Sequence, residues 1–358
     1  MILSYLEACN LRVISRAEFE PAGTVNLLIG PNGSGKTSFL ESIHFLATGR
    51  GFRGGKGQEL IRRGSAAVNV IGRRHDDEGT VTHLGIERNG QESRVSINGV
   101  SQRSAAELAR LLPVIAASPA DHHELFQSTK LRRAMLDWLV FHVEPQFFGA
   151  WSRYQTALKQ RNAELRSPGY RPKMLAPWEQ ELDEAGTAIN ACRQRILERW
   201  SAALQGTGTR LLDAKLSLEL FPGWDTTDAL RDALAASRNS DRTIGYTQLG
   251  PHRADLRMHI DALDARTYAS HGQRKLVMFA LRLAQLDVFR AARQHCAIVL
   301  IDDLAAELDP TRRRALVDGL YALGAQVFVT STEAGQSGLE ACSNGRLFHV
   351  ERGTIRAA

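Results

Sequence analysis

The chain lacks the features that mark membrane, secreted or disulfide-rich proteins. Its 358 residues contain no apolar run near the roughly 18 residues that span a bilayer. The first residues reach the acidic Glu7 without the basic stretch of a secretory signal. The four cysteines are far apart and form no CxxC pair, which argues against a zinc site, a redox motif or a disulfide framework. We therefore expect a cytoplasmic protein with reduced thiols and no membrane segment.

The chain also has no visible internal repeat or low-complexity tract, which sets solenoid folds aside. Its composition is that of an ordinary globular protein, with 43% apolar and 23% charged residues. A chain of this length can bury a sizeable core and is expected to form two or three domains. The net charge of +6 is compatible with binding to nucleic acid but does not demonstrate it.

The first third of the chain is predicted to be rich in strands. Short apolar or alternating segments are separated by turns, and Asn98–Gly99 is a typical tight-turn dipeptide. The expected strands are Val25–Ile29, Ala66–Ile71, Val81–Glu87, Arg94–Ile97 and Pro113–Ala117.

The hydrophobic period changes from about residue 124. Apolar residues recur at mostly three- and four-residue spacing from Phe147 to Leu165 and from Trp178 to Ile196. Because the segment 167–172 between them holds two prolines and a glycine, the pattern predicts a short antiparallel helical hairpin, each arm a few turns long. The hairpin is either a packed helical subdomain or a protruding arm that touches a partner or DNA.

The last third alternates between expected strands and helices, which is typical of a parallel α/β sheet. The expected strands are Cys296–Ile301 and Gln326–Thr330, the expected helices are Val277–Arg293 and Thr311–Leu323, and two earlier strands are expected at Leu216–Phe221 and Leu256–Asp261.

The most specific motif follows the strand Val25–Ile29 and precedes an expected helix, Ser38–Leu46. It reads GPNGSGKT, a complete GxxxxGK[ST] phosphate loop. Its glycines bring backbone N–H groups onto phosphate oxygens, and the helix N-terminus adds partial positive charge. Lys36 is expected to reach the β- and γ-phosphates, and the Thr37 hydroxyl to ligate Mg²⁺. The nucleotide contacts expected here are Gly30, Pro31, Asn32, Gly33, Ser34, Gly35, Lys36, Thr37 and Ser38.

A second motif ends the apolar run Ala297–Ile301 with two carboxylates, Asp302 and Asp303. A buried strand that ends in an acid is the usual partner of a phosphate loop. Asp302 is expected to hold Mg²⁺ through water, and Asp303 to polarise the attacking water. Asp303 and Lys36 are therefore the predicted catalytic residues, and Thr37 and Asp302 the predicted metal ligands.

A third motif, Ser270-His271-Gly272-Gln273, opens the helix that precedes the acidic strand. It offers a hydroxyl, backbone N–H groups and a helix dipole to an anion. As a bare helix cap it would mean nothing, but its place about 30 residues before the acidic strand makes it specific. The sequence LAAELD follows the two acids directly. The three motifs and this Leu-Asp loop, in this order, are the set found in ABC-type ATPases.

These motifs, together with ESIHFLATGRGFRG after the phosphate loop and LGPHRADL at 249–256, make the chain resemble the RecF family of bacterial DNA-repair ATPases, relatives of the SMC and Rad50 proteins. The resemblance implies an α/β fold, an ABC-type P-loop ATPase head with an inserted helical arm lobe. Residues 1–118 and 276–358 would form the ATPase lobe, and residues 119–275 the arm lobe with the signature. Arg12, Arg50 and Arg53 are implied as nucleotide or lobe contacts.

The resemblance also implies a mechanism. One subunit supplies Lys36, Thr37 and Asp302 to ATP, and a second copy supplies the signature residues Ser270, Gly272 and Gln273, so ATP and Mg²⁺ hold a homodimer together. The family binds single-stranded and gapped duplex DNA, works with RecO and RecR, and helps load the recombinase RecA at gaps during repair, replication restart and the SOS response. A weak, DNA-stimulated ATPase that acts as a switch is expected.

Some positions depart from the general ABC pattern. Asp303 stands where most ABC ATPases have Glu, and its shorter reach fits slow hydrolysis. No switch histidine follows Gln326–Thr330, where the chain reads Thr-Ser-Thr-Glu, and which hydroxyl replaces it is open. Asp121 is a candidate for the glutamine-loop position. His252 and Arg253 belong either to a structural loop or to a region near nucleotide or DNA.

Basic clusters are spread along the chain, and most such clusters are solvated helix faces. Because no base-reading motif is present, we expect DNA contacts to be mainly to the backbone and weakly sequence-specific. The clusters are 50–56, 62–63, 73–74, 130–133, 193–199 and 312–314.

Three other functions compete with this interpretation. A transporter motor subunit usually carries its signature about 100 residues after the phosphate loop, but Ser270 lies 234 residues after Lys36. A P-loop kinase has no use for a Ser-x-Gly-Gln signature. A DNA clamp with a vestigial ATP site is disfavoured by the intact Lys36, Thr37, Asp302 and Asp303.

Overall fold

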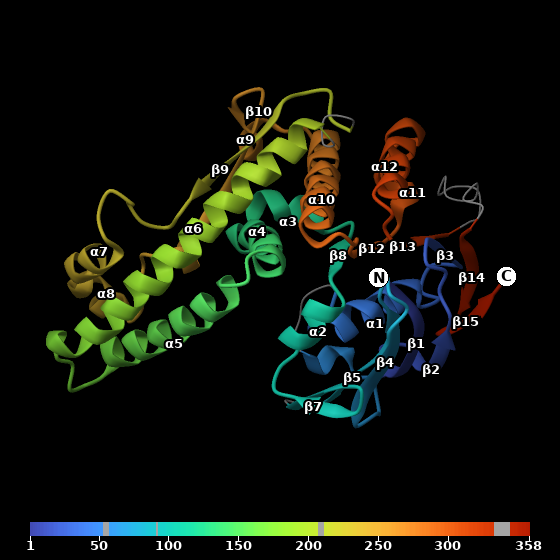
Figure 1. Ribbon diagram of the computed structural model, residues 1–358, viewed down its shortest axis with the longest axis horizontal. Coiled ribbons are helices and arrows are strands. Elements are labelled where there is room, and N and C mark those ends of the chain that lie inside the picture. Colours follow the sequence, from blue (N-terminus) through green and yellow to red (C-terminus); the bar gives the residue numbers. More distant parts are fainter. Residues whose placement is uncertain (53–56, 91, 207–210, 333–343) are drawn as a thin grey trace. The chain divides into compact units, whose positions relative to one another are not determined.

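The computed structural model describes residues 1–52, 57–90, 92–206, 211–332 and 344–358, and its contacts divide the chain into two compact units (Figure 1). Unit 1 comprises Met1–His122 and Lys275–Ala358, and unit 2 comprises His123–Arg274. The sequence placed the boundaries at 118/119 and 275/276. The first division falls later, after His122, whose Nδ1 lies 3.3 Å from the Glu307 carboxylate of unit 1.

A mainly parallel sheet in unit 1 confirms the α/β prediction. Its strand order is β15-β14-β3-β13-β12-β8, and only the β14–β15 pair is antiparallel. The inner strands are buried on both faces, which explains their continuous apolar runs. The strands are β3 (Val25–Ile29), β8 (Val114–Ala117), β12 (Ile298–Ile301), β13 (Val327–Ser331), β14 (Arg346–Glu351) and β15 (Thr354–Ala357).

A second, antiparallel sheet in unit 1 has the order β2-β1-β4-β5-β6-β7. Its strands β1 and β2 were not predicted, and in β1 a register shift between Leu3 and Tyr5 breaks the period-two alternation. The turn at Asn98 (φ 49°) and Gly99 (φ 78°) has the predicted left-handed geometry. The strands are β1 (Ile2–Leu11), β2 (Ile14–Phe19), β4 (Ala67–His75), β5 (Val81–Asn89), β6 (Glu92–Ile97) and β7 (Val100–Gln102).

The core of unit 1 joins both sheets through the helix α1 (Lys36–Thr48). Phe39, Leu40 and Ile43 of this helix are fully buried in one cluster with residues of both sheets. The phosphate loop is therefore held between a buried strand and a buried helix. The other helical segments of unit 1 are η1 (Gly57–Leu60), α2 (Ala106–Leu111), α11 (Leu304–Glu307), α12 (Pro310–Ala322) and most of α10 (His271–Arg293).

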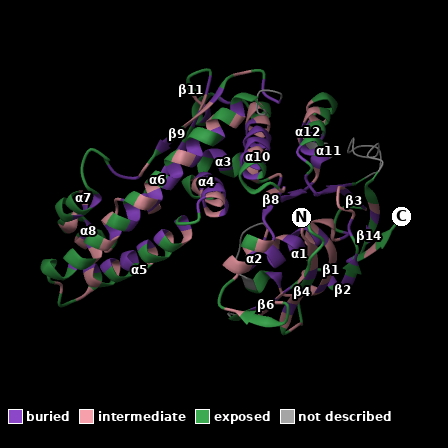
Figure 2. Ribbon diagram, in the orientation of Figure 1, coloured by how far each residue is buried: buried purple, intermediate pink, exposed green. Residues whose placement is uncertain are grey.

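Unit 2 is built on the predicted helical hairpin, α5 (Phe147–Arg166) and α6 (Ala176–Gly206), which run side by side in Figure 1. α6 has 31 residues, so this arm is much longer than the few turns expected. Figure 2 shows buried residues recurring along the length of α6. A small antiparallel sheet of β9 (Leu216–Phe221), β10 (Asp255–Ile260) and β11 (Leu263–Asp264) packs with α4 (Thr129–Val143) and α6.

The remaining helices of this region are α3 (Asp121–Gln127), α4 (Thr129–Val143), η2 (Pro172–Leu175), α7 (Leu230–Ala236), α8 (Arg238–Ile244), η4 (Pro251–Arg253) and α9 (Ala265–Tyr268). Within the described ranges, no helix is both long enough and apolar enough to cross a membrane.

Candidate nucleotide site

The phosphate loop joins the carboxyl end of β3 to the amino end of α1. Gly33 (φ 78°) and Gly35 (φ 111°) adopt the left-handed backbone that glycine accepts without strain. Gly35 is the N-cap and has no side chain with which to cap the helix, so the first N–H groups of α1 can serve an anion. The Ser34 hydroxyl is buried and has no hydrogen-bond partner in the described part of the chain. The loop thus fits a phosphate group.

The Lys36 ammonium bridges the loop itself. Its Nζ donates to the carbonyl oxygens of Gly30 (2.6 Å) and Pro31 (3.0 Å). Burial lowers the pKa of Lys36, while the carboxylates of Asp303 and Asp302 act in the opposite direction. The cation is therefore held beside both acids. Pro31, Asn32 and Gly33 are exposed at the loop surface.

The Thr37 hydroxyl and the Asp302 carboxylate meet at the same edge of the sheet. The Thr37 Oγ1 lies 3.0 Å from both Asp302 oxygens. In turn, the Thr330 hydroxyl donates to Asp302 Oδ1 (2.7 Å) and accepts the Asp303 N–H (2.8 Å). A hydroxyl beside a carboxylate is a donor set that suits Mg²⁺, so Thr37 and Asp302 fit the predicted metal position. The predicted site residues of unit 1 are thus brought together.

Thr330 is a positioning residue whose role the sequence left open. Its hydroxyl already bonds to Asp302 and to the Asp303 N–H, so it does not simply replace a switch histidine. Ser331 is also buried and Thr332 is exposed, while Glu333 lies outside the described residues. The feature that could have identified Thr330 as a site residue is its position near the end of β13, the strand between β3 and β12.

Asp303 has a left-handed backbone (φ 54°, ψ 51°), which is uncommon for a residue with a side chain. The Thr330 hydroxyl holds this conformation through the Asp303 N–H. Asp303 directly precedes α11, and its carboxylate acts on the pKa of Lys36. Strain of this kind is worth roughly 1–3 kcal/mol and is concentrated at functional sites.

The signature residues lie in unit 2 and form a capping box. The Ser270 N–H donates to the Gln273 side-chain oxygen (2.9 Å), and the Gln273 N–H donates to the Ser270 hydroxyl (3.2 Å). The cap therefore exists, but Ser270 and Gly272 are exposed. A Cβ at Gly272 would meet nothing within 4 Å, so this chain alone does not require glycine there.

The arginines implied by the resemblance have different surroundings. Arg12 donates from Nε (2.8 Å) and Nη2 (3.1 Å) to the buried Glu41 of α1. Arg50 is exposed just after α1. Arg53 lies outside the described residues. Asp121 closes a turn on Ser118 at the start of α3, which gives it a local structural partner.

The GPHRAD segment, residues 250–255, is held in unit 2 by several hydrogen bonds. His252 lies between the Tyr154 hydroxyl (2.7 Å from Nδ1) and the Thr247 carbonyl oxygen (3.1 Å from Nε2). Burial lowers the pKa of His252 to about 4, so the ring is neutral at pH 7. Arg193 and Arg133 donate to the carbonyl oxygens of Pro251 (2.8 Å) and Ala254 (2.7 Å). These contacts support the structural interpretation of His252, whereas Arg253 is exposed.

Two of the basic clusters are partly internal. Arg132 is 1% exposed and pairs with Asp255 (2.7 Å), and Arg193 is 1% exposed and pairs with Asp137 (2.8 Å). Neither guanidinium is available to DNA. Sequence patterns did not separate them from the exposed Lys130 and Arg199, because all four occur in similar charged stretches.

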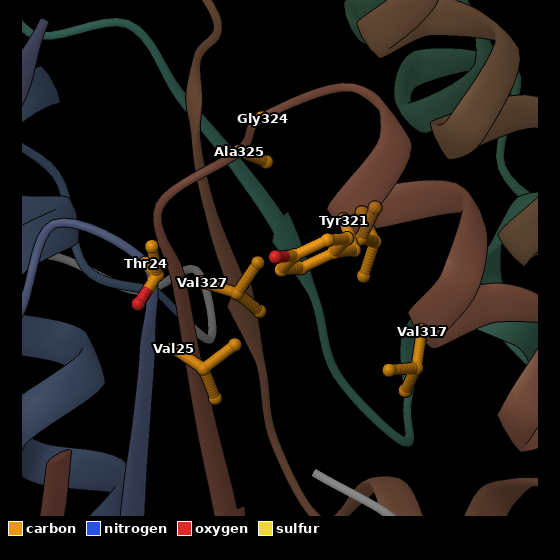
Figure 3. Close-up of a pocket in the computed structure, with 8 residues that line it drawn as sticks. Thr24, Val25, Val317, Tyr321, Gly324, Ala325 and Val327 are labelled. Carbon is orange, nitrogen blue, oxygen red and sulfur yellow. The ribbon is translucent and has the colours of Figure 1, made fainter. Parts of the chain in front are cut away.

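A cavity of about 320 Å³ lies at the opposite end of the parallel sheet (Figure 3). It is lined by Val25 and Val327, which begin β3 and β13, and by residues of α12 such as Tyr321. The phosphate loop and the acids follow the carboxyl ends of these strands, which is where α/β sheets bind ligands. The apolar cavity is therefore separate from the nucleotide site.

The fold and the site define a P-loop ATPase head of the SMC type. The family described as RecF/RecN/SMC N-terminal domain matches residues 2–356. A head domain of an Smc protein bound to a winged-helix domain of ScpA has a TM-score of 0.59 at 15% identity, covering 100% of this chain and 98% of that one, a likeness of fold alone.

The sequence relatives are more specific. The DNA replication and repair protein RecF of Pseudomonas fluorescens is 40% identical over 359 residues, covering 99% of this chain and 98% of that protein. The protein of the same name from Azotobacter vinelandii is also 40% identical, with the same coverage. A structure of the recombination mediator protein RecF with ATPrS has a TM-score of 0.87 at 25% identity and covers 99% of this chain and 97% of that one. The chain belongs to the RecF family, as its motifs predicted.

Proposed function

We propose that this protein is an ATP-dependent DNA-binding protein of recombinational repair, in which ATP joins two copies. The observation that carries the proposal is the hydrogen-bonded set of Lys36, Thr37, Asp302 and Thr330 beside an uncapped helix end. A solved relative is named as RecF-ATP in the RecFOR pathway, which supports the same ligand here. The nucleotide and Mg²⁺ would bind at the edge formed by the phosphate loop and Asp302.

The site residues of unit 1 would each have a separate task. The Lys36 ammonium exchanges its two carbonyl acceptors for phosphate oxygens, and the N–H groups of α1 donate to the same group. Thr37 and Asp302 would hold Mg²⁺, which would supply positive charge to neutralise the phosphates. Asp303 accepts a proton from the attacking water as general base. Its short side chain and its rigid backbone fit a slow ATPase that acts as a switch.

The signature residues would act on the nucleotide of a second copy. Ser270 still has its own hydroxyl proton to donate, since the cap uses only the oxygen as acceptor. Gly272 leaves open space for a close approach, as a γ-phosphate requires. Hydrolysis would then depend on a closed homodimer and would release it.

The wider role is inferred from relatives that are known as DNA replication and repair proteins and as part of the RecFOR pathway. We infer cytoplasmic action at single-strand gaps of duplex DNA, with RecR and RecO as partners in loading a RecA-type recombinase, and support of replication and of the SOS response. DNA would stimulate the ATPase. The net charge of +6 favours phosphate contacts.

The test compares wild type with Lys36→Met in equilibrium ATP binding and in DNA binding with and without ATP and Mg²⁺. The substitution removes charged hydrogen bonds worth roughly 1.5–3 kcal/mol each, so ATP affinity should fall at least about 100-fold. Lys159→Met, at an exposed position of α5, is the matched control for ATP binding. The melting temperature without nucleotide should stay unchanged. Wild-type ATP affinity in Lys36→Met would refute the site.

DNA binding provides a second readout. Wild type should bind DNA more tightly with ATP and Mg²⁺, and Lys36→Met should not respond to them. The logarithm of affinity should fall with the logarithm of salt concentration at a slope of about −0.9 per phosphate neutralised on duplex DNA. A flat salt response, or a strong preference for one sequence, would contradict the proposal.

A further inference from the structure

Two hairpin turns of unit 1 close on the phosphate loop. The first joins β1 to β2 and holds Arg12 and Val13, and the second joins β14 to β15 and holds Arg352 and Gly353. The Gly353 N–H donates to the Ser34 carbonyl oxygen (2.8 Å). A Cβ at Gly353 would lie 2.5 Å from the Val13 carbonyl oxygen, so the two turns also touch each other.

The loop glycines make the same contacts from the other side. A Cβ at Gly30 would lie 2.2 Å from the Val350 carbonyl oxygen, which leaves no space for a side chain. A Cβ at Gly35 would lie 3.0 Å from Val13 Cγ2 and 3.3 Å from Gly353 Cα. Both turns are therefore fixed parts of the loop's surroundings.

The strand order indicates which end of a nucleotide they would face. β14 lies on one side of β3, whereas β13 and β12, which carry Thr330 and Asp302, lie on the other. The terminal phosphates belong beside Lys36, Thr37 and Asp302. The nucleoside end then leads away from Asp302, toward the side of the loop where the turns lie.

The turns present two side chains that the fold itself does not use. Val13 is 49% exposed beside the loop. Arg352 is exposed, and in the described part of the chain it has no hydrogen-bonding or ionic partner. Arg12, by contrast, is held by Glu41. Arg352 also has a left-handed backbone (φ 48°), which asparagine or glycine would adopt at lower cost, so the turn geometry does not explain an arginine.

We propose that Arg352 and Val13 form the nucleoside subsite, with the Arg352 guanidinium stacked on the base and Val13 packed against it. Arginine stacks well on nucleobases because its guanidinium is planar and weakly hydrated. This inference rests on the proposed ATP site and assigns its base-recognising part. The triphosphate remains with the phosphate loop and Lys36.

The test compares two ligands by calorimetry, MgATP and inorganic tripolyphosphate with Mg²⁺, which lacks a nucleoside. Arg352→Ala should weaken MgATP about tenfold and change tripolyphosphate less than about twofold. Arg352→Lys keeps the charge but not the stacking plane, so it should resemble Arg352→Ala. Arg356→Ala removes one exposed charge from β15 of the same hairpin and should bind both ligands as wild type does.

The outcomes separate this inference from the proposed function. If wild type binds both ligands and Arg352→Ala loses nothing, or loses both equally, the subsite is wrong and the ATP site stands. Rescue by Arg352→Lys would also overturn it, because charge alone would then suffice. If wild type binds neither ligand, the ATP site and the subsite fail together. Unchanged melting temperatures verify that the variants are folded.

Discussion

The two units of the molecule use their charged residues in opposite ways. In unit 1 the charged side chains of the site, Lys36 and Asp302, lie at the edge of a buried sheet. They are next to the N-terminus of α1, which no side chain caps. In unit 2 three arginines, Arg132, Arg161 and Arg193, are at most 1% exposed and are paired with carboxylates. Charge in unit 1 is therefore available to a ligand, whereas buried charge in unit 2 holds the unit together.

This difference limits what unit 2 can offer a nucleotide. Its internal guanidinium groups are engaged by Asp255, by Glu179 and Asp241, and by Asp137. Ser270 and Gly272 of the signature, by contrast, are exposed. Under the proposed function, unit 1 would hold the nucleotide and unit 2 would present the signature to a second copy.

The largest expected effect concerns the stability of unit 2, where the contrast between the two units predicts that a buried arginine is essential. Arg161 is fully buried and bonds to Asp241 (2.7 Å) and Glu179 (3.2 Å). Arg161→Ala leaves the buried Asp241 without its cationic partner, while Glu179 keeps Arg238, so the unfolding free energy should fall by about 3–5 kcal/mol. All five tryptophans lie in unit 2, so denaturant unfolding followed by tryptophan fluorescence reports on it.

Arg153→Ala is the matched control, because it removes an arginine from the same helix, paired at the surface with Glu181 and Glu184. An exposed pair contributes little, so the unfolding curve should hardly move. Equal effects of the two substitutions would mean that the buried arginines are not what stabilises unit 2.

The next effect is a dependence of unit 2 stability on pH. The folded pKa of His252, about 4, lies below the ordinary value of 6.5, because burial penalises the charged ring. Its contribution is complete above pH 6.5 and is lost as pH falls toward 4, by up to about 3 kcal/mol. Tryptophan-detected unfolding from pH 7 to pH 4 measures it, and His252→Gln should flatten the slope in this window. An unchanged slope would show that His252 is not the group responsible.

A smaller effect is expected in unit 1, on the rate of ATP hydrolysis. Thr330→Val keeps the shape of the side chain but removes the hydroxyl between Asp302 and Asp303. The loss of a buried hydrogen-bond partner is worth about 1–3 kcal/mol, so the hydrolysis rate should fall about tenfold while ATP binding persists. Thr332→Val, exposed two residues later, should be neutral. Retained hydrolysis in Thr330→Val would show that the acidic pair does not need this bridge.

The sequence predicted the parts of the fold that obey a simple local rule. GPNGSGKT and the apolar run before Asp302 placed the phosphate loop and the acidic edge, because those residue types are dictated by local backbone and charge. β1 was missed because its bulge breaks the alternation. Thr330, Arg352 and the buried Arg161 depend on strand order and on contacts far apart in the chain, which no local pattern reveals.

The proposed nucleotide site is composite, because one copy supplies the phosphate loop and the other supplies the signature. Its most direct test is the mass of the protein with ATP and Mg²⁺, measured by light scattering for wild type and Ser270→Arg. Wild type should dimerise, whereas Ser270→Arg should bind ATP but stay monomeric, because a bulky cation would fill the approach to the partner's γ-phosphate. Loss of the helix cap alone would cost only about 1 kcal/mol of stability and would leave association intact. If Ser270→Arg dimerises with ATP as wild type does, the composite site is wrong for this protein.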